Sequence, residues 1–105
     1  MSKIKYEALN SANVKVNNSG DLERVYNIEA NANVNNLNEV SNIDNGVVKK
    51  DAEQRATFNV WGDNSLNISF YNATSEEQCA VINAVNAFIK DTKVFVKDNN
   101  MVTIS

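Results

Sequence analysis

The residue types that carry most enzyme chemistry are scarce in this chain of 105 residues, which has no histidine and one cysteine, Cys79. Without histidine there is no Ser-His-Asp triad, no Cys-His pair and no His-ligated zinc. One cysteine cannot form an intrachain disulfide or a CxxC redox pair. The three glycines fall in predicted turns, which leaves none for a phosphate-binding loop. We therefore expect no enzymatic activity, no metal site and no cofactor.

The single cysteine and the carboxylates give little further indication of enzyme chemistry. Cys79 falls near the start of a predicted helix, and with no histidine to act as its base we expect an unreactive helix cysteine. The alternative is a thiol that is modified by oxidation or forms an intermolecular disulfide. Glu23 and Glu29 fall on the outward side of predicted strands, where Glu23 is expected to face Lys15. An exposed cross-strand ion pair of this kind contributes only about 0.3 kcal/mol.

Asparagine is the most unusual feature of the composition, with 20 in 105 residues. Amides can hydrogen-bond to sugars or to another sheet, and an aromatic ring can stack on a sugar. A candidate ligand face consists of outward-facing residues of two predicted hairpins: Asn27, Asn31, Asn33, Trp61 and Tyr71. This face would suit a small-ligand or glycan-binding module. A codon bias toward AT-rich sequence explains the same enrichment, because asparagine occurs in every segment.

A lysine–aromatic–lysine pattern occurs near the C-terminal end, where Lys93, Phe95 and Lys97 share one face of a predicted strand. Such a face suits stacking on single-stranded nucleic acid, and it equally suits an edge strand guarded by lysines. The net charge of −3 favours the guarded edge, because nucleic-acid binders are usually basic. We keep single-stranded nucleic-acid binding as a minor alternative.

The elements that would position these residues are mostly strands, because apolar residues recur at every second position. Between residues 4 and 34 they fall mainly on even numbers, which predicts one long hairpin with a three-residue loop at Gly20. Each arm would be about 43 Å long at ~3.3 Å per residue. A second hairpin is predicted from residues 56 to 70, with a loop at residues 62–64.

Residues 35–54 allow two interpretations. Asn45-Gly46 is a strong signal for a two-residue hairpin loop, since both residues tolerate positive φ. The alternative is a polar excursion with little regular structure. The hairpin interpretation turns a set of apolar residues inward: Leu37, Ile43, Val48, Ala52, Ala56, Phe58 and Val60.

A helix is predicted from Thr74 or Ser75 to about Lys90, with a capping box at its start and one apolar face. Two short strands, 93–97 and 101–104, are expected to follow it. The expected architecture is a single α+β domain over residues 1–105. It is an antiparallel sheet of six to eight strands in a hairpin meander, with one amphipathic helix on one face.

A helix of about 16 residues, about 24 Å long, cannot cover such long strands. We therefore expect either a second subunit over the uncovered apolar face or a sheet that curls around the helix. The expected function is a non-enzymatic interaction or structural domain that acts through protein–protein contact, as a homo-oligomer with a C2 dimer favoured. The expected interface comprises Ile4, Tyr6, Ile28 and Val34. No apolar run suits a signal peptide or a membrane span, so we expect a cytoplasmic protein with no membrane contact.

Overall fold

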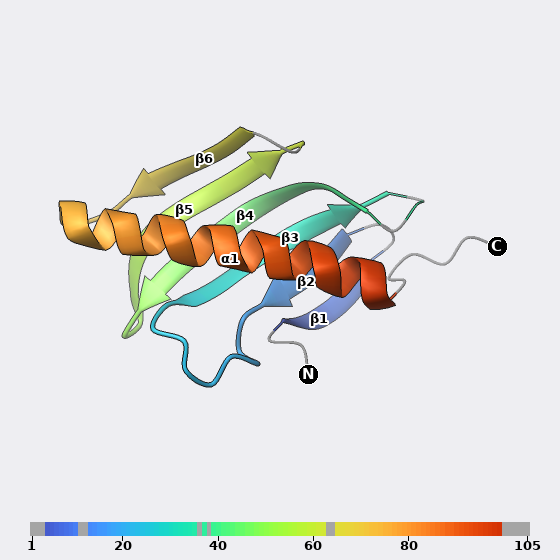
Figure 1. The fold of residues 1–105 in the computed structure, drawn as a ribbon, viewed down its shortest axis with the longest axis horizontal. Helices are drawn as coiled ribbons and strands as arrows, with labels where there is room; N and C mark the ends of the chain where they lie inside the picture. Colours follow the sequence, from blue (N-terminus) through green and yellow to red (C-terminus); the bar gives the residue numbers. More distant parts are fainter. Residues whose placement is uncertain (1–3, 11–12, 36, 38, 63–64, 100–105) are drawn as a thin grey trace.

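The computed structural model describes residues 4–10, 13–35, 37, 39–62 and 65–99. They form one antiparallel sheet followed by one helix, so the expected α+β class is confirmed. The elements are β1 (Lys5–Asn10), β2 (Asn13–Asn17), β3 (Asn27–Val34), β4 (Val40–Lys50), β5 (Glu53–Trp61), β6 (Ser65–Phe70) and α1 (Ser75–Asn99). The six strands lie in the sheet in chain order, as a meander. Figure 1 shows α1 crossing one face of this sheet.

The hydrophobic core lies between α1 and the sheet face that the helix covers. Each strand places alternate side chains on that face, because successive strand residues point to opposite sides. The buried apolar residues of the strands include Val14, Val16, Ile28, Ala30, Ala32, Val34, Ile43, Val48, Ala56, Phe58 and Val60. The helix adds Val81, Val85, Phe88 and Val96. The period-two pattern of the sequence therefore identified the inward side of the strands.

The first predicted hairpin is wrong in its pairing. β1 pairs with β2, and β2 pairs with β3, so Lys15 lies opposite Asn31 instead of Glu23. The connection between β2 and β3 spans residues 18–26 and is closed by the Asn18 side chain. Its Nδ2 donates to the carbonyl of Tyr26 at 2.8 Å, and its Oδ1 accepts from the amide of Ile28 at 2.9 Å. The backbone amide of Asn18 still donates to the carbonyl of Ile28 at 3.1 Å, and its side chain then closes the loop. The long arms of the prediction do not form, because β1 and β2 are separate paired strands and β2 ends at Asn17.

The predicted turn at Asn45-Gly46 is also wrong, because β4 runs straight through both residues. The register between β4 and β5 shifts there, from Ile43–Val60 to Gly46–Phe58, which is a β-bulge. Asn45 uses its tolerance of positive φ in this bulge, at φ 52°. The turn itself is made by Asp51 and Ala52, both at positive φ, between the paired Lys50 and Glu53.

The regular strand at β4 also contradicts the interpretation of residues 35–54 as an irregular polar excursion. Ile43, Val48, Ala56, Phe58 and Val60 point inward, as predicted. Two members of the predicted inward set do not. Leu37 is 65% exposed beyond the end of β3, and Ala52 is exposed in the β4–β5 turn.

The helix begins where its capping box predicts, since the hydroxyl of Thr74 accepts a hydrogen bond from the amide of Glu77 at 3.2 Å. It does not end near Lys90. The predicted strand 93–97 is wrong, because those residues continue α1 to Asn99. The buried stripe continues with them, at Val85, Phe88, Thr92 and Val96, and packing of this stripe on the sheet favours the helix. The predicted strand 101–104 lies outside the described residues.

The greater length of α1 removes the reason for expecting an uncovered apolar face. At ~1.5 Å per residue a helix of 25 residues is about 37 Å long. Three residues of the expected interface, Ile4, Ile28 and Val34, lie in the core and are each 2% exposed. In this conformation they have almost no surface through which to contact a second subunit. Tyr6 belongs to β1, and its side chain lies outside the described part of the structure.

Candidate functional site

The face of the sheet opposite α1 is the main candidate surface, and we call it the open face. Within the described residues, no helix or strand packs on it. It is formed by the outward side chains of the strands, which are mainly amides and hydroxyls. Its members are Asn13, Lys15, Asn17, Asn27, Glu29, Asn31, Asn33, Asn42, Asp44, Val47, Lys49, Thr57, Asn59, Trp61, Ser65, Asn67 and Ser69.

Hydrogen bonds between side chains order this surface. Asn13 and Asn33 are paired in the register, and Asn13 Nδ2 donates to Asn33 Oδ1 at 2.6 Å. Asn33 Nδ2 in turn donates to Asp44 Oδ2 at 3.2 Å. Toward the other edge, Asn67 Nδ2 donates to Asn59 Oδ1 at 3.1 Å. A primary amide has two N–H donors and a carbonyl that accepts two bonds, so each amide keeps capacity for a ligand while its orientation is fixed.

The structure brings three of the five predicted ligand-face residues onto one part of the open face. Asn33 pairs with Asn42, which in turn pairs with Trp61, so these residues form one row across β3, β4 and β5. Asn31 lies two residues along β3 from Asn33. Trp61 is 57% exposed at the end of this row. An aromatic ring therefore lies in line with a row of ordered amides.

The other two predicted residues do not belong to that row. Asn27 lies at the start of β3, where its Oδ1 accepts a hydrogen bond from Arg24 Nε at 2.7 Å. Tyr71 follows β6, and its backbone amide donates to the carbonyl of Arg55 at 2.8 Å. Roughly six residues of strand, about 20 Å, separate it from Trp61. One ligand the size of a monosaccharide cannot contact both aromatic rings.

Several members of the open face were not identified from the sequence. Asn59 and Asn67 have the outward parity of the second hairpin, so the signal for them was present. Asn42 and Asp44 flank the inward Ile43, so the hairpin interpretation of residues 35–54 implied their outward side. Their partners could not be predicted, because the pairing of β4 with β3 includes a register shift. Hydrogen bonding between Asn33 and Asp44 is a consequence of that bulged register.

A second cluster of polar residues lies at the start of α1. The carboxylate of Glu77 is 3.5 Å from Arg55 Nε and 3.9 Å from Lys50 Nζ. Lys50 Nζ also lies 5.9 Å from the centre of the ring of Tyr26. Burial chiefly, and then the negative charge of Glu77, raise the pKa of Tyr26, while the charge of Arg55 opposes them. This cluster ties the first turn of the helix to β4 and β5.

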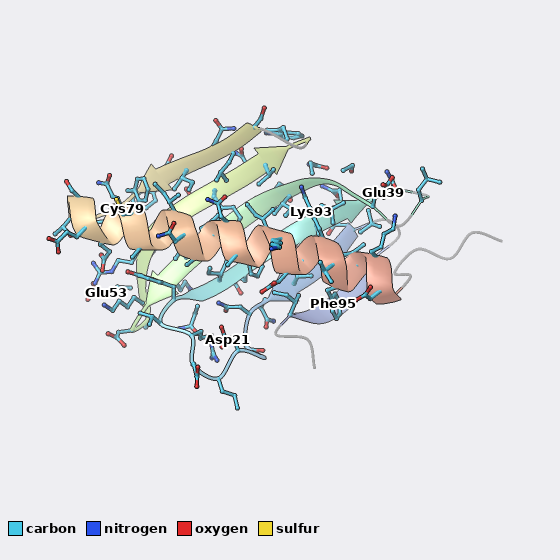
Figure 2. The ribbon with its side chains drawn as sticks, viewed as in Figure 1. Asp21, Glu39, Glu53, Cys79, Lys93 and Phe95 are labelled. Atoms are coloured by element: carbon cyan, nitrogen blue, oxygen red, sulfur yellow. The ribbon has the colours of Figure 1, made fainter. Side chains whose placement is uncertain are left out.

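Cys79 is the remaining candidate nucleophile from the sequence. Cys79 is exposed on α1 (Figure 2). Within the described part of the chain, no group of three or more histidine, cysteine or acidic residues could hold a metal ion. No helix among these residues combines the length and apolar character needed to span a bilayer.

The predicted lysine–aromatic–lysine face does not exist. Residues two apart on a helix differ by about 200° in direction, and Figure 2 shows Lys93 and Phe95 on opposite sides of α1. This removes the observation on which single-stranded nucleic-acid binding rested.

Comparisons of the chain with protein-family models, with curated proteins and with solved structures find no match.

Proposed function

We propose that this chain is a non-enzymatic interaction domain that binds another protein through the open face of its sheet. The observation that carries the proposal is the composition of that face. The cores of protein interfaces are depleted in charged residues and enriched in aromatic residues. Across β5 and β6 the open face carries Thr57, Asn59, Asn67 and Ser69, with Trp61 at its end.

The order of the open face supports the same proposal. Amides that hydrogen-bond to each other, as Asn13 does to Asn33, lose little conformational freedom when a partner binds. Preorganisation of this kind lowers the entropic cost of association. The proposal includes self-association as a C2 dimer, since the C2 dimer is the commonest closed assembly of identical chains.

A photo-crosslinking experiment tests binding of a partner to the open face. A photoreactive phenylalanine analogue is introduced either at Thr57, in the middle of the open face, or at Asn86, exposed on α1. The proposal predicts one discrete cross-linked protein product from position 57 in extracts of the source cells, and none from position 86. Addition of excess unlabelled chain should abolish that product. Equal products from both positions, or none from position 57, would contradict the proposal.

A glycan is the second candidate ligand, and one observation favours it. Trp61 lies in the same row as Asn42 and Asn33, so a sugar stacked on the indole would have amides beside its hydroxyl groups. Trp61 is the only tryptophan in the chain, so its fluorescence reports on this row alone. A saturable change in emission with one class of sugar, lost in Asn33→Ala, would support the glycan. Unchanged emission across a broad sugar panel would exclude it.

A further inference from the structure

One edge of the sheet, β6, lacks the features that normally prevent edge strands from pairing with other chains. Its sequence, SLNISF, contains no charged residue and no proline. Its register with β5 is regular from Trp61–Ser65 to Ala56–Phe70, without a bulge. Natural edge strands are usually protected by lysine, proline or a bulge. The opposite edge, β1, differs, because its register shifts between Tyr6 and Ala8.

The backbone of β6 offers hydrogen-bonding groups at this edge. The amide of Tyr71 donates to the carbonyl of Arg55, so odd-numbered residues here face β5. In an antiparallel pair the N–H and C=O of alternate residues face alternate sides. Those of Leu66, Ile68 and Phe70 therefore face away from β5, where no described strand follows. Three residues thus present donors and acceptors in the spacing of a sheet ladder.

The side chains of the same three residues form an incomplete margin of the core. Leu66, Ile68 and Phe70 point to the helix side of the sheet and pack against the core, yet each is only half-buried. Another strand beside β6 would cover them. The edge therefore has unpaired backbone groups and partly exposed apolar side chains at the same positions.

We infer that β6 pairs antiparallel with β6 of a second copy, which makes one continuous twelve-stranded sheet with C2 symmetry. This inference rests on the self-association included in the proposed function and names the surface that performs it. With Ile68 on the two-fold axis, Leu66 of one copy lies opposite Phe70 of the other, so apolar residues meet apolar residues. On the open face Asn67 lies opposite Ser69 of the second copy. In this register the N–H and C=O groups of Leu66, Ile68 and Phe70, which face away from β5, all pair with the second copy.

The charges near β6 permit its pairing with β6 of a second copy. Each chain carries a net charge of −3, which repels a second copy, but between Ala56 and Phe70 the only charged residue in the sequence is Asp63. The self-pairing therefore brings no like charges directly opposite each other across the axis. Pairing of β6 with β1 of another copy would instead place the bulge of β1 in the ladder. It would also produce an open-ended assembly.

Sedimentation of the purified chain tests the pairing with two charge variants. In the proposed register, Asn67→Lys combined with Ser69→Lys places two lysine pairs directly across the axis. Asn67→Lys combined with Ser69→Glu places two ion pairs there. Like charges directly opposite in a sheet are destabilising, so the first variant should weaken the dimer by roughly tenfold or more, while the second should leave it within a few-fold of wild type. Asn83→Lys combined with Asn86→Lys adds the same charge at two exposed positions of α1, away from β6 and from the open face. It is the matched control and should change the dimer little.

Disulfide cross-linking tests the register independently in a Cys79→Ser background. Residue 67 of one copy opposes residue 69 of the other, at a separation that a disulfide spans. A mixture of the Asn67→Cys and Ser69→Cys chains should therefore cross-link efficiently under mild oxidation, and either chain alone should not.

The outcomes separate this inference from the proposed function. A folded wild-type chain that is monomeric at several tens of micromolar would refute both the edge pairing and the self-association. A dimer that the paired lysines do not weaken would refute the edge pairing and leave self-association through another surface. A concentration-dependent series of larger species would show pairing of β6 with β1 and overturn the C2 arrangement. Because purified chain contains no other partner, none of these results depends on what the open face binds.

Discussion

Gly46 in β4 lies directly against the ring of Phe58 in β5, so close that a Cβ on Gly46 would come 2.5 Å from Cε1 of that ring. The ring in turn meets Phe88 of α1 edge to face, with centroids 6.2 Å apart. The glycine therefore leaves the space in which an aromatic ring joins the sheet to the helix. The bulge at Asn45 brings Gly46 opposite Phe58 in the register.

Gly46→Ala should destabilise the protein by about 1–3 kcal/mol, because the new methyl group overpacks the space that Phe58 occupies. Urea unfolding followed by fluorescence or circular dichroism measures this. In a Phe58→Leu background the same substitution should cost less, because a smaller side chain yields to the methyl group. Equal costs in both backgrounds would mean that the penalty comes from the backbone and not from the ring.

Val94 and Val96 give a direct test of the helical continuation of α1. Val96 is 0% exposed and Val94 is 53% exposed, although they are two residues apart. Val96→Ala should cost about 2 kcal/mol through lost burial. Val94→Ala should stay within about 0.5 kcal/mol of wild type, since alanine is also the better helix former. Similar costs at both positions would indicate a strand, in which the two side chains share one face.

Phe88 and Asn86, which precede Val94 and Val96 in α1, test which side of the helix faces the sheet. Phe88 is 3% exposed against the sheet, and Asn86 is exposed on the outer side of α1. Phe88→Ala should lower the free energy of unfolding by roughly 3–5 kcal/mol. Asn86→Ala should change it by less than about 0.5 kcal/mol. A costly Asn86→Ala would show that the outer side of the helix is covered in solution.

Tyr26 should make the protein sensitive to alkali. Its pKa is raised in the folded state, chiefly by burial and then by the charge of Glu77. Above the ordinary tyrosine pKa of about 10 the unfolded chain releases a proton that the folded chain retains. The stabilisation from Tyr26 is therefore complete below that pH and is lost as pH rises through the higher folded pKa.

Tyrosinate absorbance during an alkaline titration measures this effect. One tyrosine should ionise later than an unfolded reference, and Tyr26→Phe should remove that late component. Glu77→Gln should move it toward the ordinary pKa, because the neutral amide no longer repels the tyrosinate. A late component that persists in Tyr26→Phe would assign it to another tyrosine.

Local sequence determined which side of each strand faces the core. The even-numbered apolar residues of β2 and β3, Val14 and Val16 and then Ile28 to Val34, are inward because a strand alternates its side chains whatever strand lies beside it. Local sequence also determined the start of α1, since the Thr74 cap needs only residues within one helical turn. The outward position of Asn31, Asn33 and Trp61 on the candidate site follows from the same alternation.

Tertiary structure alone decided which strands are neighbours, and with that which open-face residues meet. Alternation defines a side but not a partner, so the bonds that Asn33 makes to Asn13 and Asp44 depend on a loop closed by Asn18 and a bulge at Asn45. Positive φ at Asn45 is compatible with a turn or with a bulge, and the long-range pairing of β4 with β5 selected the bulge. The segment around Val96 has apolar residues that suit a strand or a helix. Burial of Val96 in the same stripe as Phe88 and Thr92, against a sheet built from distant sequence, selected the helix.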